Sequence, residues 1–157
     1  RTEGILEEYG FHRYEISNYA REGKECRHNL GYWSRVEYLG IGLGASSFIS
    51  NTRYHLCTDM ISYIERIGSG EDLREEIEVL TKEDAMEEFM FLGLRMTAGV
   101  SETEFYKNFK VPIEEVYGEV LEKYRSMGLM EKNKDFWRFT RQGIHVSNQI
   151  LADFLQD

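Results

Sequence analysis

The chain has 157 residues, enough to bury a core as one domain or as a domain joined to part of another. Its residues are 41% hydrophobic and 30% charged, which is typical of a folded globular protein rather than a disordered one. The net charge of −9 would repel phosphates, and the few cations gather only thinly over residues 132–141, so we expect no nucleic-acid partner.

The apolar runs and the cysteines indicate where the protein works. No apolar run approaches the length of a membrane span, so we do not expect an integral membrane protein. The two cysteines, Cys26 and Cys57, form neither a Cys-x-x-Cys metal motif nor a disulfide framework. A reducing cytoplasm is therefore the predicted location.

The first predicted element is the end of a helix, Leu6 to Gly10, closed by its C-terminal glycine. Because the chain begins within this helix and without a methionine, we expect a piece of a longer protein. Residues 11–16 predict a strand, and helix, glycine and strand together are typical of an α/β unit.

The next predicted elements lie between residues 38 and 80. Residues 38–49 are apolar and rich in small side chains, which predicts a buried strand. Residues 52–56 predict a second strand after a turn at Ser50 and Asn51, and Asp59 is a predicted cap for the helix that follows. We expect an acidic linker over residues 71–80, between a domain at 1–70 and another at 81–157.

Helix caps are the clearest signals after residue 80. Thr81 and Ser101 each begin a capping-box pattern, and Pro112 suits the first turn of a third helix. In the first of these helices Arg95 is predicted to face outward. A β-hairpin over residues 129–139 and a single last helix capped by Thr140 complete a winged-helix-like outline.

A winged helix usually suggests DNA binding, but the charges on the third predicted helix oppose it. That helix presents Glu114, Glu115, Glu119 and Glu122 against Lys123 and Arg125. Four carboxylates facing phosphates cost more than two cations recover. We therefore predict a structural or protein-docking role for this part of the chain.

Three side chains on one short segment could take part in ligand binding. His28 is a candidate metal ligand, and Tyr32 and Trp33 offer flat apolar faces to a porphyrin. By spacing alone, simple packing of the two aromatic rings explains the pattern equally well. Glu15 and Asn18, at a predicted strand end, are weaker candidates.

A glycine-rich segment follows, at Gly40, Gly42 and Gly44. It does not match the dinucleotide fingerprint, because the third glycine comes too early and no clear helix follows to receive a pyrophosphate. The pattern allows either close approach to a cofactor or tight strand packing.

Four motifs occur in the order found in one known family. They are Tyr14–Ala20, Cys26–Trp33, Gly40–Ala45 and Glu87–Arg95. Together they resemble the second half of the oxygen-independent coproporphyrinogen III oxidase-like radical SAM proteins, and the resemblance spans nearly the whole chain. The His-Asn-x-x-Tyr-Trp form of the second motif resembles the haem-chaperone branch of that family.

The resemblance implies a fold and a set of site residues. The fold is α+β, with the C-terminal piece of a radical SAM partial (β/α) barrel at 1–70, followed by a mostly helical, winged-helix-like domain with a small β-hairpin. It makes His28 the ligand of haem iron and places Asn29, Tyr32 and Trp33 with it at the cofactor. A last group would lie near S-adenosylmethionine: Gly42, Gly44 and Ala45.

One family motif is absent from the chain. The three-cysteine motif that holds a [4Fe–4S] cluster is missing, and Cys26 and Cys57 cannot supply three neighbouring thiolates. We therefore expect the cluster and S-adenosylmethionine to belong to the longer parent, and the chain alone not to cleave S-adenosylmethionine.

Three hypotheses about function remain open at this point. The first is that the parent binds haem and hands it to acceptor proteins. The second is oxidative decarboxylation of coproporphyrinogen III, and the third is a protein-interaction module of the winged-helix type. In each case we expect the excised piece to expose apolar surface and to self-associate.

Overall fold

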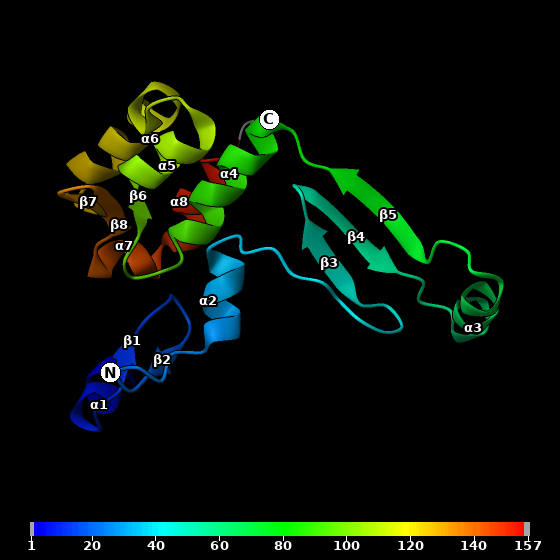
Figure 1. The fold of residues 1–157 in the computed structure, drawn as a ribbon. Coiled ribbons are helices and arrows are strands. Elements are labelled where there is room, and N and C mark those ends of the chain that lie inside the picture. Colours follow the sequence, from blue (N-terminus) through cyan, green and yellow to red (C-terminus); the bar gives the residue numbers. More distant parts are fainter. Residues whose placement is uncertain (1, 156–157) are drawn as a thin grey trace. The chain divides into compact units, whose positions relative to one another are not determined.

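The computed structural model describes residues 2–155 and confirms the α+β class (Figure 1). The helices are α1 (Thr2–Glu8), α2 (Arg27–Trp33), α3 (Met60–Ser69), α4 (Lys82–Gly93), α5 (Glu102–Phe109), α6 (Ile113–Ser126), α7 (Arg141–His145) and α8 (Ser147–Ala152). The strands are β1 (His12–Arg13), β2 (Tyr19–Ala20), β3 (Ser46–Ile49), β4 (Thr52–Leu56), β5 (Arg74–Val79), β6 (Val100–Ser101), β7 (Met130–Asn133) and β8 (Phe136–Phe139).

The chain divides into two compact units. The first contains residues 1–35 and 86–157, and the second contains residues 36–85. Because one unit is built from two distant parts of the sequence, contacts between those parts decide its structure.

The N-terminal part of the first unit is a helix followed by a two-stranded antiparallel ribbon. Helix α1 ends as the glycine predicts, with Gly10 in the left-handed region at φ 79°. The strand expected at residues 11–16 is shorter, because only β1 pairs with β2, opposing His12 to Ala20. Glu15, two residues after the end of β1, bridges instead to Met96 beyond α4.

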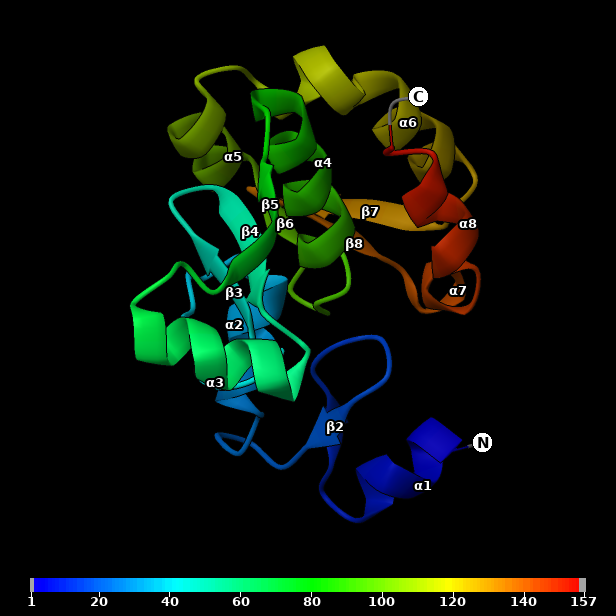
Figure 2. The same cartoon turned by 90° about the vertical axis from the view of Figure 1, so that its right-hand side faces the viewer.

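The C-terminal part of the first unit has the predicted winged-helix-like outline. Its antiparallel sheet has the order β6-β8-β7, and Figure 2 shows α4, α6 and α8 grouped around the β7–β8 hairpin. The core is aromatic and well buried: the ring of Phe105 lies 5.5 Å from Phe89 and 4.8 Å from Phe109. Helix α6 buries the expected face, including Ile113 and Leu121.

Side-chain caps mark the first residues of α5 and α7 in this part. Ser101 accepts a hydrogen bond from the Glu104 amide and caps α5 as predicted. Asp135, in the hairpin turn, also accepts from the Thr103 amide at 3.1 Å and so joins the hairpin to the same helix end. The last predicted helix is in fact two, α7 and α8, because Val146 leaves helical geometry at φ −118°.

The second unit is an antiparallel sheet of order β3-β4-β5, and α3 connects β4 to β5 along the chain. The turn at Ser50 and Asn51 forms as expected, with φ of 50° and 58°, which matches the twist of the β3–β4 hairpin. Asp59 caps α3 by accepting from the Ser62 amide, and Gly70 ends it with φ 75°.

Two expectations for the second unit differ from the structure. Only residues 46–49 of the predicted strand 38–49 are a strand, while Leu39, Ile41 and Leu43 are exposed on the loop before it. In the segment expected to be a linker, residues 74–79 form β5. Its charged composition suits a strand whose side chains are mostly exposed, and composition alone cannot distinguish that from a loop.

None of the helices in residues 2–155 combines the length and the apolar composition that a bilayer crossing requires.

Candidate functional site

Helix α2 carries the first group of candidate residues. It is only seven residues long, contains Gly31 and has no side-chain cap, since Cys26 at its N-cap makes no such hydrogen bond. Short helices with these features are marginal on their own, and none of the residues of α2 is buried. The position of α2 must therefore come from contacts at its ends.

His28 and Tyr32 lie one turn apart on the same face of α2. Their ring centroids are 4.6 Å apart in an edge-to-face arrangement, as expected for residues at i and i+4. Both side chains are exposed, and Asn29 beside them is half-buried. The helix thus presents an imidazole with an aromatic ring against it.

The other histidines have different surroundings. His12 is hydrogen-bonded to Glu25 at 2.9 Å, and His55 lies within 3.8 Å of Glu75 and 3.7 Å of Glu76. His145 is exposed at the end of α7. Within residues 2–155, His28 and His145 have neither a carboxylate partner nor a side-chain hydrogen bond, which leaves their nitrogens available to a metal, and an aromatic ring packs against His28.

Trp33, at the end of α2, lies against an arginine from another element. The guanidinium carbon of Arg95 is 4.5 Å from the centroid of the Trp33 ring, within the range of a cation–π interaction. The terminal nitrogen of Arg95 is 3.6 Å from Glu15 Oε2. The sequence pattern had predicted an outward Arg95 on a helix, which is wrong: α4 ends at Gly93, and Arg95 is mostly covered.

The glycine-rich segment belongs to the second unit. Gly42 and Gly44 have φ of 103° and 67°, so the turn itself requires glycine at both positions. The turn is anchored by hydrogen bonds from the Ala45 amide to Gly42 and from the Gly44 amide to Cys57. A Cβ at Gly42 would meet no atom within 4 Å, so its open side leaves room for a ligand.

The candidate residues thus come from both units. His28, Asn29, Tyr32 and Trp33 share α2, and the structure brings them together. Gly42, Gly44 and Ala45 share one turn of the other unit.

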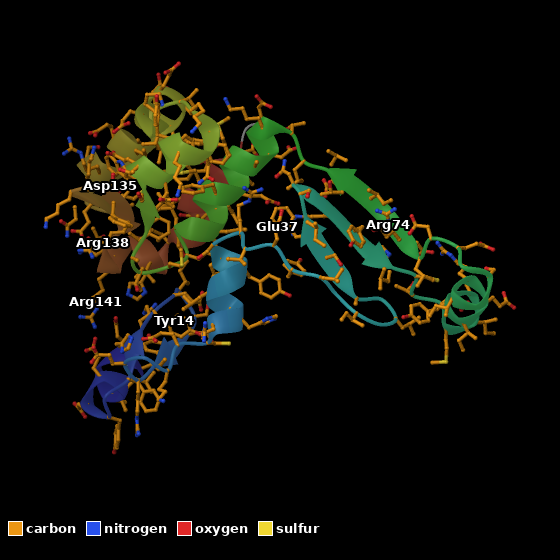
Figure 3. All side chains as sticks on the ribbon, viewed as in Figure 1. Tyr14, Glu37, Arg74, Asp135, Arg138 and Arg141 are labelled. Carbon is orange, nitrogen blue, oxygen red and sulfur yellow. The ribbon has the colours of Figure 1, made fainter. Side chains whose placement is uncertain are left out.

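Two cavities of the first unit lie near the candidate residues. The larger, of about 460 Å³, has a lining that includes Arg13, Arg95, Arg138 and Arg141 together with Glu3, Glu7 and Glu131. Figure 3 labels Arg138 and Arg141, which come from β8 and the start of α7. Arg138 pairs with Glu131 at 2.7 Å and Arg141 with Glu3 at 2.8 Å, so the charges at this cavity are largely balanced.

The smaller cavity, of about 250 Å³, adjoins the end of α2. Its apolar wall includes Trp33, Phe89 and Phe136. The buried Nε1 of Trp33 has no hydrogen-bond partner in the described residues. Sequence reasoning did not identify this cavity, because its walls come from segments more than 50 positions apart.

A carboxylate pair in the C-terminal part has shifted pKa values. Burial and the neighbouring Glu114 raise the pKa of Glu102 in spite of Lys132 and of the hydrogen bond from Trp137 Nε1. The hydrogen bond with Glu102 lowers the pKa of Glu114. Lys132 Nζ bridges them, at 2.5 Å from Glu102 and 3.2 Å from Glu114. This arrangement resembles a structural ion-pair network, and neither of the two cavities described above is lined by it.

The described side chains do not form a metal site by themselves. Across residues 2–155, no group of three histidine, cysteine, aspartate or glutamate side chains is placed to hold an ion. Cys26 is exposed and Cys57 is buried, in different units. An iron–sulfur cluster therefore does not fit this part of the chain.

Known proteins similar to the chain are consistent with one family. Residues 80–146 match the family described as HemN C-terminal domain. A Bacillus subtilis protein named heme chaperone HemW is 38% identical over 151 residues, covering 96% of this chain and 40% of the relative. The Lactococcus lactis protein of the same name is 35% identical over 153 residues, covering 98% and 40%. The chain thus spans about 40% of the length of these relatives.

A solved structure shares the fold. The coproporphyrinogen III oxidase HemN of Escherichia coli, described as a radical SAM enzyme, superposes with a TM-score of 0.76 over 99% of this chain and 39% of that one. Sequence identity is 14%, so this similarity establishes the fold alone.

Proposed function

The chain belongs to the family of coproporphyrinogen III oxidase-like radical SAM proteins, and from that premise we propose that the protein containing it binds haem and transfers it to acceptor proteins. The relatives with 35–38% identity carry the name heme chaperone. Haem is cargo in this proposal rather than a resident cofactor.

The observation that carries the proposal is the geometry of α2. His28 is exposed, packs edge-on to Tyr32 and has no carboxylate partner among the residues that the structure describes, whereas His12 and His55 both face carboxylates. A neutral imidazole is a common axial ligand of haem iron. We assign iron ligation to His28 and contact with the porphyrin face to Tyr32 or Trp33, with Asn29 beside them.

S-adenosylmethionine and a [4Fe–4S] cluster belong to the whole protein in this proposal. Two cysteines in different units cannot supply three thiolates, so the cluster ligands would lie outside this chain. The turn at Gly42, Gly44 and Ala45 fits a contact with S-adenosylmethionine, because its left-handed backbone is open on the side where a Cβ of Gly42 would stand. We infer that this turn contributes binding surface rather than a reactive group.

The remaining parts of the proposal concern organisation and location. We propose that residues 81–157, most of which form one compact unit with residues 1–35, supply a docking or covering surface, since α6 presents four glutamates and this charge favours a protein partner over a nucleic acid. We place the protein in the cytoplasm, because its two free cysteines suit a reducing compartment.

The test of the haem assignment is a titration of the full-length protein with haem, followed by the Soret band. His28→Ala should abolish the histidine-ligated spectrum and weaken binding, while His145→Ala, at another exposed histidine, should leave both unchanged. If His28→Ala binds haem with the same spectrum and affinity, the ligand assignment is wrong.

Porphyrinogen oxidation is the second candidate, and the fold shared with HemN is the observation that favours it. Anaerobic incubation of the reconstituted full-length protein with coproporphyrinogen III and S-adenosylmethionine would decide. Decarboxylated product would support this candidate, and its absence with an intact cluster would exclude it.

A further inference from the structure

Arg95 is held by its backbone against the N-terminal part of the first unit. The Ile16 amide donates to the Arg95 carbonyl at 2.9 Å, and the Thr97 amide donates to the Tyr14 carbonyl at 3.1 Å. Together with the bridge from Glu15 to the residue after Arg95, these bonds join two segments about 80 positions apart. The backbone of Arg95 is therefore fixed by tertiary pairing, not by a helix.

The side chain of Arg95 is directed by a buried carboxylate. Glu15 has no exposed surface, and its Oε1 accepts from the Ser17 amide at 2.8 Å and from Asn18 Nδ2 at 2.6 Å. These bonds fix the carboxylate, whose other oxygen lies 3.6 Å from the guanidinium of Arg95. A buried charge needs an opposite charge beside it, so Glu15 and Arg95 constrain each other.

Trp33 is the third member of this arrangement. Its ring covers the guanidinium of Arg95 at 4.5 Å, and Glu15 lies against the same guanidinium. Buried atoms of all three residues, namely Glu15 Oε2, Arg95 Nε and Trp33 Nε1, lack a hydrogen-bond partner within the described residues. Such atoms reduce stability, so packing alone does not account for this choice of residues.

Helix α2 depends on the contacts at its C-terminal end. The helix is short and uncapped and contributes no buried residue. Beyond Trp33, the chain is held by the Arg35–Glu88 ion pair at 3.0 Å and by a weak contact of Ser34 with Met96. His28 lies five residues before Trp33 in the same helix, so a shift of Trp33 would move His28 with it.

We propose that Arg95 is a positioning residue, oriented by Glu15, that fixes Trp33 and thereby the direction in which α2 presents His28. The inference rests on the proposed haem-binding function and adds a role for two residues that do not touch the iron. Lysine at position 95 keeps the charge and part of the cation–π contact, whereas glutamine keeps a polar but shorter side chain and loses both.

The test uses the full-length protein with Arg95→Gln, Arg95→Lys and Glu15→Gln, and with Arg138→Gln as the matched control. Arg138 lies in the same unit, lines the larger cavity together with Arg95, and pairs with Glu131 rather than with Glu15. Tryptophan fluorescence and near-ultraviolet circular dichroism without haem report on the stack at Trp33. The Soret spectrum and haem affinity report on the presentation of His28.

We expect Arg95→Gln to change the Trp33 signals and to weaken haem binding about tenfold, with a shifted Soret band, because the cation–π contact and the ion pair are lost together. Arg95→Lys should keep affinity within about threefold of the wild type, since the charge remains. Glu15→Gln should shift the Soret band in the same direction as Arg95→Gln, and Arg138→Gln should change neither signal.

Two results would overturn the inference. In one, Arg95→Gln binds haem with the wild-type affinity and spectrum although His28→Ala abolishes ligation; the haem assignment then survives and the positioning role does not. In the other, Arg95→Gln and Arg95→Lys lose haem affinity equally, and both also lose helical signal in far-ultraviolet circular dichroism. That result would make Arg95 a structural residue only. If His28→Ala itself leaves binding unchanged, the iron-ligand assignment fails first.

Discussion

The carboxylate of Glu3 and the guanidinium of Arg141 form an ion pair with a nitrogen–oxygen distance of 2.8 Å, although 138 positions separate them in the chain. Glu3 belongs to α1 and Arg141 is the first residue of α7. Arg13 Nε lies 3.7 Å from the same glutamate. The pair therefore joins the N-terminal helix of the first unit to its C-terminal part.

Removing this pair should loosen α1 without unfolding the unit. Arg141 is 68% exposed, and an exposed ion pair contributes between 0 and about 1 kcal/mol. We expect Glu3→Gln to increase amide hydrogen exchange in α1 while the melting temperature stays nearly constant. The control is Glu8→Gln at the exposed end of the same helix. Unchanged exchange in α1 would show that the pair does not hold the helix.

The capping box at the start of α4 gives a stability prediction. The Asp84 amide donates to Thr81 Oγ1 at 3.1 Å, and the Thr81 amide donates to Asp84 Oδ2 at 2.8 Å. Thr81→Ala should lower the free energy of unfolding by about 1 kcal/mol in urea titrations. Lys82→Ala, one residue further on, serves as the control, and equal midpoints for the two variants would argue against the cap.

The same box predicts a dependence on pH. The hydrogen bonds with Thr81 lower the pKa of Asp84 below its ordinary value of 3.8. The folded-state pKa is depressed, so this stabilisation is present above pH 3.8 and is lost as the pH falls through the lowered pKa. Asp84→Asn should remove the loss of unfolding free energy that protonation of Asp84 causes at low pH. Urea titrations at several pH values would measure it. An unaltered pH profile in Asp84→Asn would contradict the assignment.

Glu102, which is paired with Glu114, should make stability depend on pH in the sense opposite to Asp84. The pKa of Glu102 is raised above 4.5 by burial and by Glu114. A raised folded-state pKa favours the folded protein below pH 4.5, and this contribution is lost as the pH rises through the raised pKa. Between pH 4.5 and the raised pKa, Glu102→Gln should flatten the dependence of the unfolding free energy on pH, whereas Glu115→Gln should not. Carboxyl titration followed by NMR would check the direction independently.

Apolar exposure on the second unit predicts self-association of the chain. Ile61, Ile64 and Ile67 form one face of α3 and are 54 to 69% exposed. Contiguous apolar surface of this kind favours association. Sedimentation velocity should therefore show oligomers of the 157-residue chain that diminish when the three isoleucines are replaced by serine. Val146→Ser, at an exposed valine of the other unit, is the control, and a monodisperse wild-type monomer would disprove the prediction.

Sequence alone could not predict the network around Trp33. Arg95 follows a helical pattern in the sequence and was expected to face outward, yet α4 ends at Gly93 and the chain turns to pair with residues 14–16. Glu15 and Asn18 were weak candidates at a strand end, and the structure makes Glu15 a buried partner of Arg95. The local sequence around Glu15, Trp33 or Arg95 does not specify the other two residues of this network.

The sequence by itself determined the features that depend on neighbours within about four positions. The caps at Asp59, Thr81 and Ser101 and the turn at Ser50 and Asn51 form as expected, because each is satisfied by adjacent backbone groups. The ordered motifs also identified the family, since a series of short matches needs no coordinates.

Only the tertiary structure decided which apolar and charged residues are covered. Residues 39–43 are as apolar as a buried strand, yet Ile41 is 87% exposed, while the carboxyl group of Glu15 is fully buried. Burial depends on which distant segments pack against each position, and the local amino-acid composition does not determine that packing. Pairing of residues 14–16 with 95–97 places Arg95 over Trp33, and so turns an unremarkable arginine into the residue that supports the candidate haem-binding helix.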